Sequence, residues 1–251
     1  MRKTIICLMM LCLAGTAHAF DPDMIQIHGF VSQGYLKSSE HDFWFAETED
    51  GTFQFNEAGL SVSAEPIENL RLGVQLLSRD LGEVGNNEVE IDWAYGDYYF
   101  REWLGIRAGI MKRPYGLYNQ SRDIDAARTE IFLPSSIYRE VFRDWFMRTT
   151  GVGIYGTLPG DVSYEIQYGT FDLDTDGGVA KALSVWAGSS FTDIKTDNVI
   201  AASLQWDSPL PELIFGVSGF RLGDIEMITD ISRMNMTRYD TYVASVEYGV
   251  E

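Results

Sequence analysis

Segments that alternate apolar and polar side chains recur along almost the whole chain, and this pattern limits the folds that it can adopt. Between residues 70 and 76 every second position is leucine or valine, and Arg71, Gly73 and Gln75 stand between them. A period of two is that of a β-strand, because successive side chains of a strand point to opposite faces. We therefore predict an all-β protein with ten strands, at residues 25–36, 52–64, 69–79, 87–100, 104–111, 150–158, 161–171, 197–206, 212–222 and 237–250.

The connections between these strands alternate between short and long. The short ones are 65–68, 101–103, 159–160 and 207–211, and the long ones are 37–51, 80–86, 112–149, 172–196 and 223–236. Outer-membrane barrels have short periplasmic turns and long external loops, and a tilted strand of about ten residues crosses a bilayer. We therefore expect an antiparallel transmembrane β-barrel. A soluble exported β-domain that binds a partner is the alternative, because a sandwich also alternates, with its apolar face inside.

The first nineteen residues have the pattern of a secretory signal peptide. Arg2 and Lys3 precede an apolar run, and the small residues around Ala19 form a cleavage site. Both cysteines of the chain, Cys7 and Cys12, lie in this segment. We therefore expect residues 1–19 to be removed and the barrel domain, residues 20–251, to have no disulfide.

Charge and aromatic residues indicate where the exported domain resides. The formal net charge is −18, which argues against nucleic acid as a partner, because phosphate binding needs a basic surface. Trp103 and Trp206 lie beside predicted short turns, and aromatic residues form girdles at membrane interfaces. We expect the protein in the cell outer membrane, in contact with membrane lipid and lipopolysaccharide.

Two stretches resemble Gram-negative outer-membrane porins. The segment IQIHGFVSQGYL is similar to a porin first strand, and LGIRAGIMKRPYGLYNQSRDID with the later TTGVGIYG is similar to the phosphate-selective porin O and P type. The resemblance covers most of residues 25–171. It implies a homotrimer of barrels with 16–18 strands, in which the third long loop folds into the pore. On this basis we expect the chain to be the N-terminal portion of a longer porin, incomplete at its C-terminal end.

The third long loop, residues 112–149, is the most basic segment of the chain, with seven basic and five acidic residues. A wide barrel encloses an aqueous channel, which such a loop can narrow, and arginine in a pore favours anions. We expect passive diffusion of small hydrophilic solutes or ions, with a weak anion preference. Pairing with nearby carboxylates is the structural alternative for each arginine. The predicted pore and constriction residues are Arg71, Arg107, Arg113, Arg122, Arg128, Glu90 and Asp92.

Alternation and local signals add detail to this prediction. In the predicted strand 87–100, Glu90 and Asp92 face inward, while Trp93 and Tyr95 share the opposite face with the apolar residues. In loop 112–149, Asp123 is a candidate N-cap for a short helix. Five aromatic residues are candidates to anchor the loop to the barrel wall, namely Phe132, Tyr138, Phe142, Trp145 and Phe146.

One acidic stretch has the spacing of a calcium ligand set. Asp172, Asp174 and Asp176 alternate before Gly177, which resembles the start of an EF-hand loop. Leu183 occupies the position where that loop needs glutamate. We favour a solvated acidic loop and expect no cofactor, with Ca²⁺ as the alternative.

Residues that could carry out catalysis are few. Only His28 and His41 remain after processing, and the sequence has neither a G-x-S-x-G nor an H-E-x-x-H motif. We therefore expect the protein not to be an enzyme, and an outer-membrane barrel enzyme is the alternative.

Overall fold

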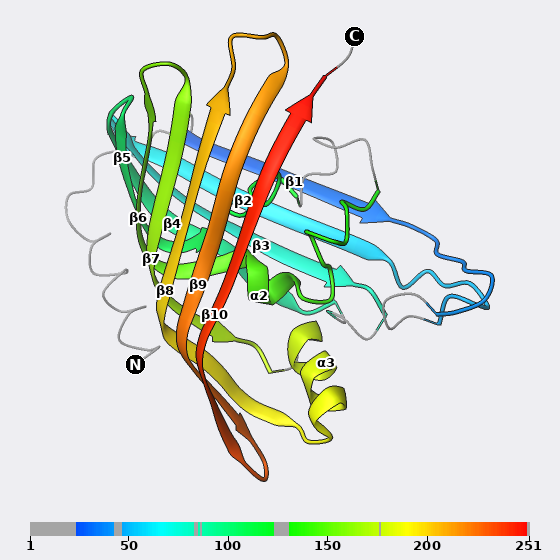
Figure 1. Ribbon diagram of the computed structural model, residues 1–251. Helices are drawn as coiled ribbons and strands as arrows, with labels where there is room; N and C mark the ends of the chain where they lie inside the picture. Colours follow the sequence, from blue (N-terminus) through cyan, green and yellow to red (C-terminus); the bar gives the residue numbers. More distant parts are fainter. Residues whose placement is uncertain are drawn as a thin grey trace.

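The computed structural model describes residues 24–42, 47–82, 85, 87–122, 131–175 and 177–249. These residues form one antiparallel sheet of ten strands in which every strand pairs with its neighbours in the sequence (Figure 1). The all-β antiparallel fold and the ten strands are therefore confirmed. The predicted signal peptide, residues 1–19, and the helix cap at Asp123 lie outside the described residues. In the described part of the chain, no helix has the length and apolar character needed to cross a membrane.

The strands and helices have the following bounds. The strands are β1 (Ile25–Gln33), β2 (Asn56–Ile67), β3 (Leu70–Asp80), β4 (Val89–Arg101), β5 (Leu104–Lys112), β6 (Arg148–Leu158), β7 (Val162–Leu173), β8 (Phe191–Asp207), β9 (Leu213–Thr229) and β10 (Arg233–Tyr248). Helix α2 (Arg143–Met147) lies between β5 and β6, and helix α3 (Gly178–Ala187) lies between β7 and β8.

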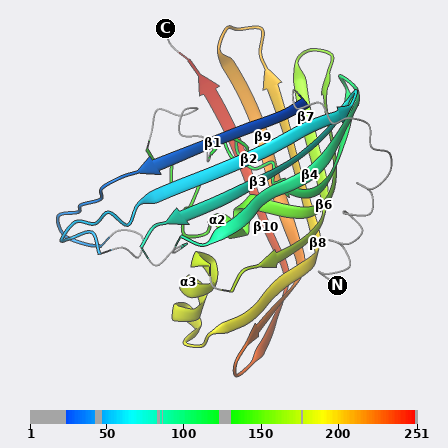
Figure 2. The same cartoon turned by 180° about the vertical axis from the view of Figure 1, so that it is seen from behind.

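The sheet is strongly twisted and curved. Strands β1–β3 run at a steep angle to β8–β10, and the concave side holds α2, as the two opposite views show (Figures 1 and 2). Within the described residues the order is linear, and β1 and β10 each pair with one strand. The chain thus forms a curved wall with two free edges.

The prediction of a long loop at residues 223–236 is wrong. Strands β9 and β10 continue through it and are joined by a turn at residues 230–232. The extension contains several charged residues, and ion pairs support the strand pairing there. Glu226 of β9 accepts Lys195 of β8 at 3.5 Å and Arg233 of β10 at 3.1 Å.

The convex face of the sheet is apolar and exposed. Cross-strand pairs such as Leu60 with Leu76 and Ile154 with Ile166 form continuous rows on it. Side chains on these rows are exposed by 38–84%. They include Ile27, Val31, Leu60, Leu72, Leu76, Ile106, Val152, Ile154, Ile166, Tyr168, Ile200, Leu204, Val217 and Val246. A soluble sandwich buries its apolar face, whereas the apolar face of this sheet is exposed.

A β-bulge changes which residues of β4 face each side of the sheet. Gln75 of β3 pairs with Trp93, but the next residue, Leu76, pairs with Ile91, so Asp92 is the extra residue. A bulge places two residues opposite one and reverses the alternation beyond it. Trp93 and Tyr95 therefore lie on the concave face, and their predicted placement on the apolar face is wrong.

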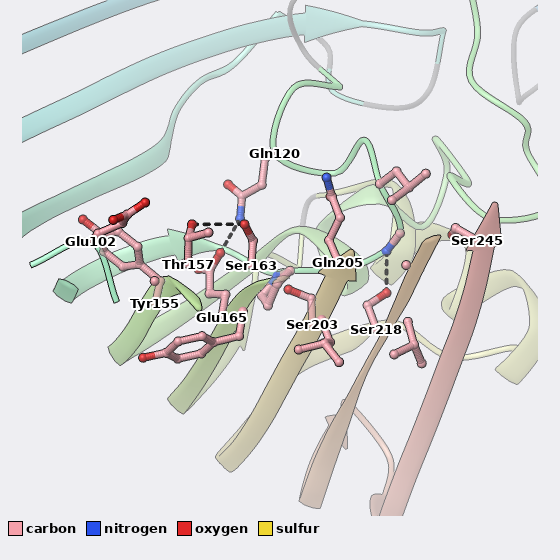
Figure 3. Close-up of a pocket in the computed structure, with 18 of the residues that line it drawn as sticks. Glu102, Gln120, Tyr155, Thr157, Ser163, Glu165, Ser203, Gln205, Ser218 and Ser245 are labelled. Carbon is pink, nitrogen blue, oxygen red and sulfur yellow. Dashed lines mark hydrogen bonds between the residues drawn. The ribbon is translucent and has the colours of Figure 1, made fainter. Parts of the chain in front are cut away.

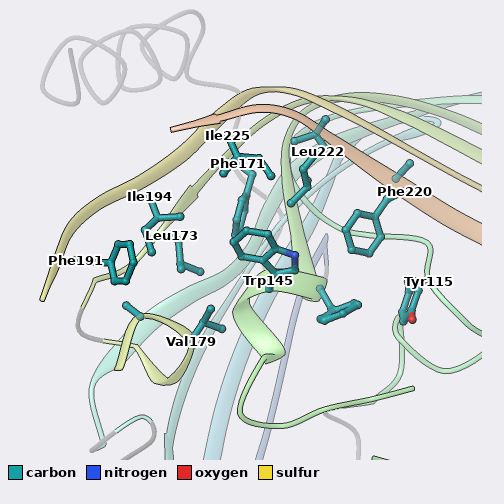
Figure 4. Close-up of a cluster of buried hydrophobic side chains, with 14 residues drawn as sticks. Tyr115, Trp145, Phe171, Leu173, Val179, Phe191, Ile194, Phe220, Leu222 and Ile225 are labelled. Carbon is teal, nitrogen blue, oxygen red and sulfur yellow. The ribbon is translucent and has the colours of Figure 1, made fainter. Parts of the chain in front are cut away.

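A cluster of buried apolar side chains joins the loop to the wall. Trp145 and Phe146 of α2 pack against Phe171 of β7 and Phe220 of β9 (Figure 4). The cluster continues to Val179 of α3. The predicted wall anchors Trp145 and Phe146 are confirmed, and they hold the loop on the concave face.

Candidate functional site

Outside the buried apolar cluster around Trp145, the concave face is lined by polar and charged side chains at the positions that alternate with the apolar rows. Arg107 of β5 and Asp97 of β4 are direct partners in the strand register. Gln167 of β7 is fully buried on the same face, where its side-chain amide donates to the Lys112 carbonyl at 2.7 Å. The wall is therefore polar on the side that the loop covers.

Arg107 is the centre of a charged row on this face. Its guanidinium lies 3.2 Å from an Asp97 carboxylate oxygen and 3.8 Å from one of Glu165. It is also placed between the rings of Tyr95 and Tyr155, at 4.5 and 4.9 Å from their centroids. Ion pairs and two cation–π contacts fix the plane of the guanidinium.

Arg71 is the accessible member of the same row. Its guanidinium donates to the Tyr95 hydroxyl at 2.9 Å and lies 3.9 Å from Asp97. Its side chain is 46% exposed, compared with 15% for Arg107 and 9% for Asp97. The structure thus presents a cation, with its carboxylate partner recessed behind it, toward the concave side.

Arg113 has a different environment from the one expected of a pore residue. It is fully buried, and it donates to the Thr149 hydroxyl at 3.1 Å and to the Trp145 carbonyl at 2.7 Å. The Arg148 carbonyl accepts a third hydrogen bond, and the Phe220 ring centroid is 4.4 Å away. Burial lowers the pKa of Arg113 to about 9. This arginine ties the two ends of loop 112–149 together.

Arg122 also has a structural environment. Glu140 accepts hydrogen bonds from Arg122 within the loop and from Arg79 of β3, the latter at 3.0 Å. Burial by itself raises the pKa of Glu140, but the charges of Arg122, Arg79 and Arg143 outweigh burial and hold the pKa below its ordinary value of 4.5. We call Arg79, Arg122 and Glu140 the loop latch, because they join the loop to the wall.

Asp92, the bulge residue, makes a second attachment. Its carboxylate accepts from the Gln75 amide at 3.0 Å and from Arg143 of α2 at 2.8 Å, and Lys112 lies at 3.3 Å. The side chain of Asp92 is 2% exposed. The bulge thus aims this carboxylate at the loop, and Asp92 serves as an attachment point for the loop.

A polar cavity of about 370 Å³ lies between the loop and strands β6–β10 (Figure 3). Its walls hold hydroxyl, amide and carboxylate groups, and the Gln120 amide donates to Glu165 at 3.3 Å. The Gly116 amide of the loop donates to the Ser218 hydroxyl at 2.8 Å. The polar side chains that line it include Glu102, Thr157, Ser163, Ser203, Gln205, Ser218 and Ser245. Such a lining offers hydrogen bonds to hydrophilic solutes.

The remaining predicted residues are placed as follows. Glu90 is half-buried and lies 3.7 Å from Arg148, and Arg128 is outside the described residues. Asp172 is the last residue but one of β7 and lies opposite Lys195, Asp174 is exposed just after the strand, and Asp176 is outside the described residues. Among the residues that the structure describes, no three histidine, cysteine or acidic side chains are grouped so as to hold a metal ion.

The serine, threonine and glutamine residues of the cavity were not among the predicted site residues. Each occupies an inward strand position, such as Ser203 opposite Ser218. Single small polar residues at such positions carry little sequence signal. The one sequence feature that could have identified them is their position on the inward-facing side of alternating strands.

No protein-family model and no curated protein matches the chain. Among solved structures, the chain is similar to OmpTdeltaL8, a loop L8 deletion mutant of OmpT, an outer membrane protein of Vibrio cholerae. The TM-score is 0.42 and the sequence identity 11%, over 91% of this chain and 78% of that chain. The description of that protein agrees with the predicted outer-membrane location. A TM-score of this size leaves the functional argument to the residues described above.

The prediction that the chain is not an enzyme is wrong as an exclusion. It depends on two missing sequence motifs, and catalytic residues can be brought together by the fold without a local motif. Enzymatic activity therefore has to be measured alongside transport.

Proposed function

We propose that the protein is an outer-membrane channel of the porin kind, through which small hydrophilic solutes and ions diffuse. The observation that carries this proposal is the polarity of the sheet. Its convex face is an exposed apolar surface, and its concave face is covered by a loop and is polar outside the buried apolar cluster around Trp145. Such a wall fits lipid on one side and water on the other.

The attached loop supports a restricted passage. The loop latch, the Asp92 cluster and the Trp145 cluster fix loop 112–149 to the concave face at three places. A narrow, fixed passage lets a wide barrel discriminate between solutes. An exposed apolar patch of this extent marks a membrane or partner surface, so partition of the protein into the aqueous phase without detergent would favour the soluble exported β-domain instead.

The charged row supports a weak preference for anions. Arg71 is far more exposed than Asp97 behind it, so a solute on the concave side meets the guanidinium first. Arginine also presents a planar donor fork to carboxylate and phosphate. The predicted homotrimer and the contact with lipopolysaccharide stay predictions.

The test is conductance of the full chain in planar bilayers, with a salt gradient to give the reversal potential. We expect discrete open steps and a small anion preference, which Arg71→Gln shifts toward cations. Arg139→Gln is the matched control, because Arg139 is an exposed loop residue. Inserted protein that conducts no ions and admits no sugars into vesicles would contradict the proposal. Lipid and peptide hydrolysis are assayed with the same preparation, and turnover without conductance would establish the enzymatic alternative.

A further inference from the structure

The convex face carries a groove that the channel function does not use. Ala202 of β8 and Gly219 of β9 are direct cross-strand partners, and their small size leaves a hollow between larger neighbours. Ile166 of β7 and Tyr242 of β10 flank this pair in the strand register. The resulting cavity has a volume of about 730 Å³, within the range of sites for small organic ligands.

The groove is apolar along its length and charged at one end. Leu204 and Val217 border the hollow toward the short turns, and Ile200 and Arg221 border it toward the long loops. Arg221 is thus the charged side chain that ends an apolar wall. Since successive residues of a strand rise ~3.4 Å, Arg221 lies roughly 27 Å along β9 from Leu213. The apolar band of outer-membrane barrels is about 25 Å tall, so Arg221 is near its outer boundary.

The outward positions beyond this level are polar. Tyr168 and Ile200 pair in the row of Arg221, and the next outward residues toward the loops are Thr170 and Asn198. This change from apolar to polar indicates the level of the outer headgroups. A charged group there can meet lipid phosphates.

Two arginines share a single carboxylate at this level. The Arg221 guanidinium lies 2.7 Å from an Asp240 carboxylate oxygen, and Arg238 pairs with the other oxygen. The two arginine side chains are 43% and 59% exposed, while Asp240 is 16% exposed. Two cations and one anion leave one positive charge in excess. A charge on a lipid-facing wall is costly unless it is paired, so an anion is the partner that fits.

We infer that this groove holds an anionic phospholipid-type molecule of the outer leaflet, with one acyl chain along Ala202 and Gly219 and its phosphate on Arg221 and Arg238. The inference rests on the proposed membrane location of the convex face. Charge complementarity selects this occupant, because an apolar trough that ends in paired guanidinium groups matches an acyl chain that ends in a phosphate.

The test is native mass spectrometry of the full chain in detergent with dimyristoyl phosphatidylglycerol or dimyristoyl phosphatidylcholine. We expect the anionic lipid to be retained about tenfold more strongly. The double variant Arg221→Gln/Arg238→Gln should lose this preference, and Arg221→Lys/Arg238→Lys should keep part of it. Arg233→Gln is the matched control, because Arg233 is an exposed arginine of β10 that pairs with Glu226 beyond the groove.

A second variant tests the groove itself. Ala202→Leu fills the hollow with a side chain that the exposed position can accommodate, and should remove retention of the lipid. Ala108→Leu makes the same change on the convex face of β5 and should leave retention intact. Inorganic phosphate at millimolar concentration should not displace the lipid, because it lacks the acyl chain.

The outcomes separate this inference from the channel proposal. A chain that inserts and conducts but retains both lipids equally, or retains phosphatidylglycerol unchanged in the double variant, overturns the inference alone. Loss of a protein dimer or trimer in Ala202→Leu, without loss of lipid, assigns the groove to a second copy and also overturns it. A chain that does not insert into vesicles overturns both.

Discussion

At the residue scale, Arg113 shows how a buried cation can be stabilised without a carboxylate. Three oxygen atoms accept its donors, and aromatic rings cover its faces. Even with the pKa lowered to about 9 by burial, the side chain stays charged near neutral pH. Its sequence position, directly after a strand and before Pro114, gives no sign of this burial.

Replacing Arg113 should therefore destabilise the loop attachment. Arg113→Ala leaves three acceptors without a donor, and we expect a loss of about 3 kcal/mol in the free energy of unfolding. Urea titration in detergent micelles measures the change. The exposed Arg139→Ala should change the same quantity by less than about 0.5 kcal/mol. Equal midpoints for the two variants would show that Arg113 has no anchoring role.

The lowered pKa of Glu140 predicts how the stability of the protein depends on pH. Because its pKa in the folded state is held below 4.5, the loop latch contributes stability that is present above about pH 4.5. That contribution is lost as the pH falls through the folded-state pKa. The stability difference between the wild type and Glu140→Gln should therefore be constant near neutral pH and shrink below about pH 4.5. A difference that stays unchanged down to about pH 3 would contradict this assignment.

At the element scale, helix α2 attaches loop 112–149 to the wall. Trp145 packs edge-on against Phe171 and Tyr239, with centroids 5.8 and 5.6 Å apart. Both partners belong to the wall. The helix has five residues, too few to be stable alone, so packing on the wall maintains it.

Removing the Trp145 side chain should release the loop from the wall. Trp145→Ala creates a cavity that costs about 3–5 kcal/mol. We expect larger single-channel conductance and faster proteolysis within residues 113–147. Trp186→Ala is the control, because Trp186 on α3 is 82% exposed. Conductance that is unchanged in Trp145→Ala would mean that the loop does not narrow the passage.

Sequence periodicity predicted the elements well where both faces of a strand have a clear character. All ten strands were found, because leucine, valine and isoleucine alternate with polar residues. The phase of β4 beyond Asp92 was missed, since tryptophan and tyrosine suit either face of a barrel wall. The extensions of β8, β9 and β10 were missed as well, because pairing there depends on charged residues such as Glu226 and Arg233.

The candidate site was less predictable than the strands. Arg71 and Arg107 were identified because they occupy the polar positions between alternating apolar residues, and both lie on the concave face. Arg113 and Arg122 were grouped with them, although their carboxylate, carbonyl and hydroxyl partners lie 18 to 36 residues away. Tertiary contacts of this kind decide whether an arginine faces water, and composition cannot reveal them.

At the scale of the whole molecule, the two faces of the sheet should respond differently to the same charge. Val152→Arg places a cation on the convex face in the middle of the wall, and we expect a cost of about 2–4 kcal/mol in vesicles. Ser203→Arg places it in the cavity that Glu165 also lines, where a carboxylate can pair with it, and should cost far less. Equal costs for the two variants, measured by urea unfolding from vesicles, would argue against a lipid-facing convex surface.

The strand order and the contacts of the loop together determine the order in which the wall and the docked loop can form. Every strand pairs with the one before it, so the wall can grow by adding one hairpin after another. The loop cannot complete its docking in the same way, because Gly116 binds Ser218 of β9, 102 residues later, and distant contacts form late. Until β9 arrives, the loop can be attached to β3 and β4, but its contact with Ser218 is missing. The width of the passage is therefore decided by strands that join after most of the wall has been built.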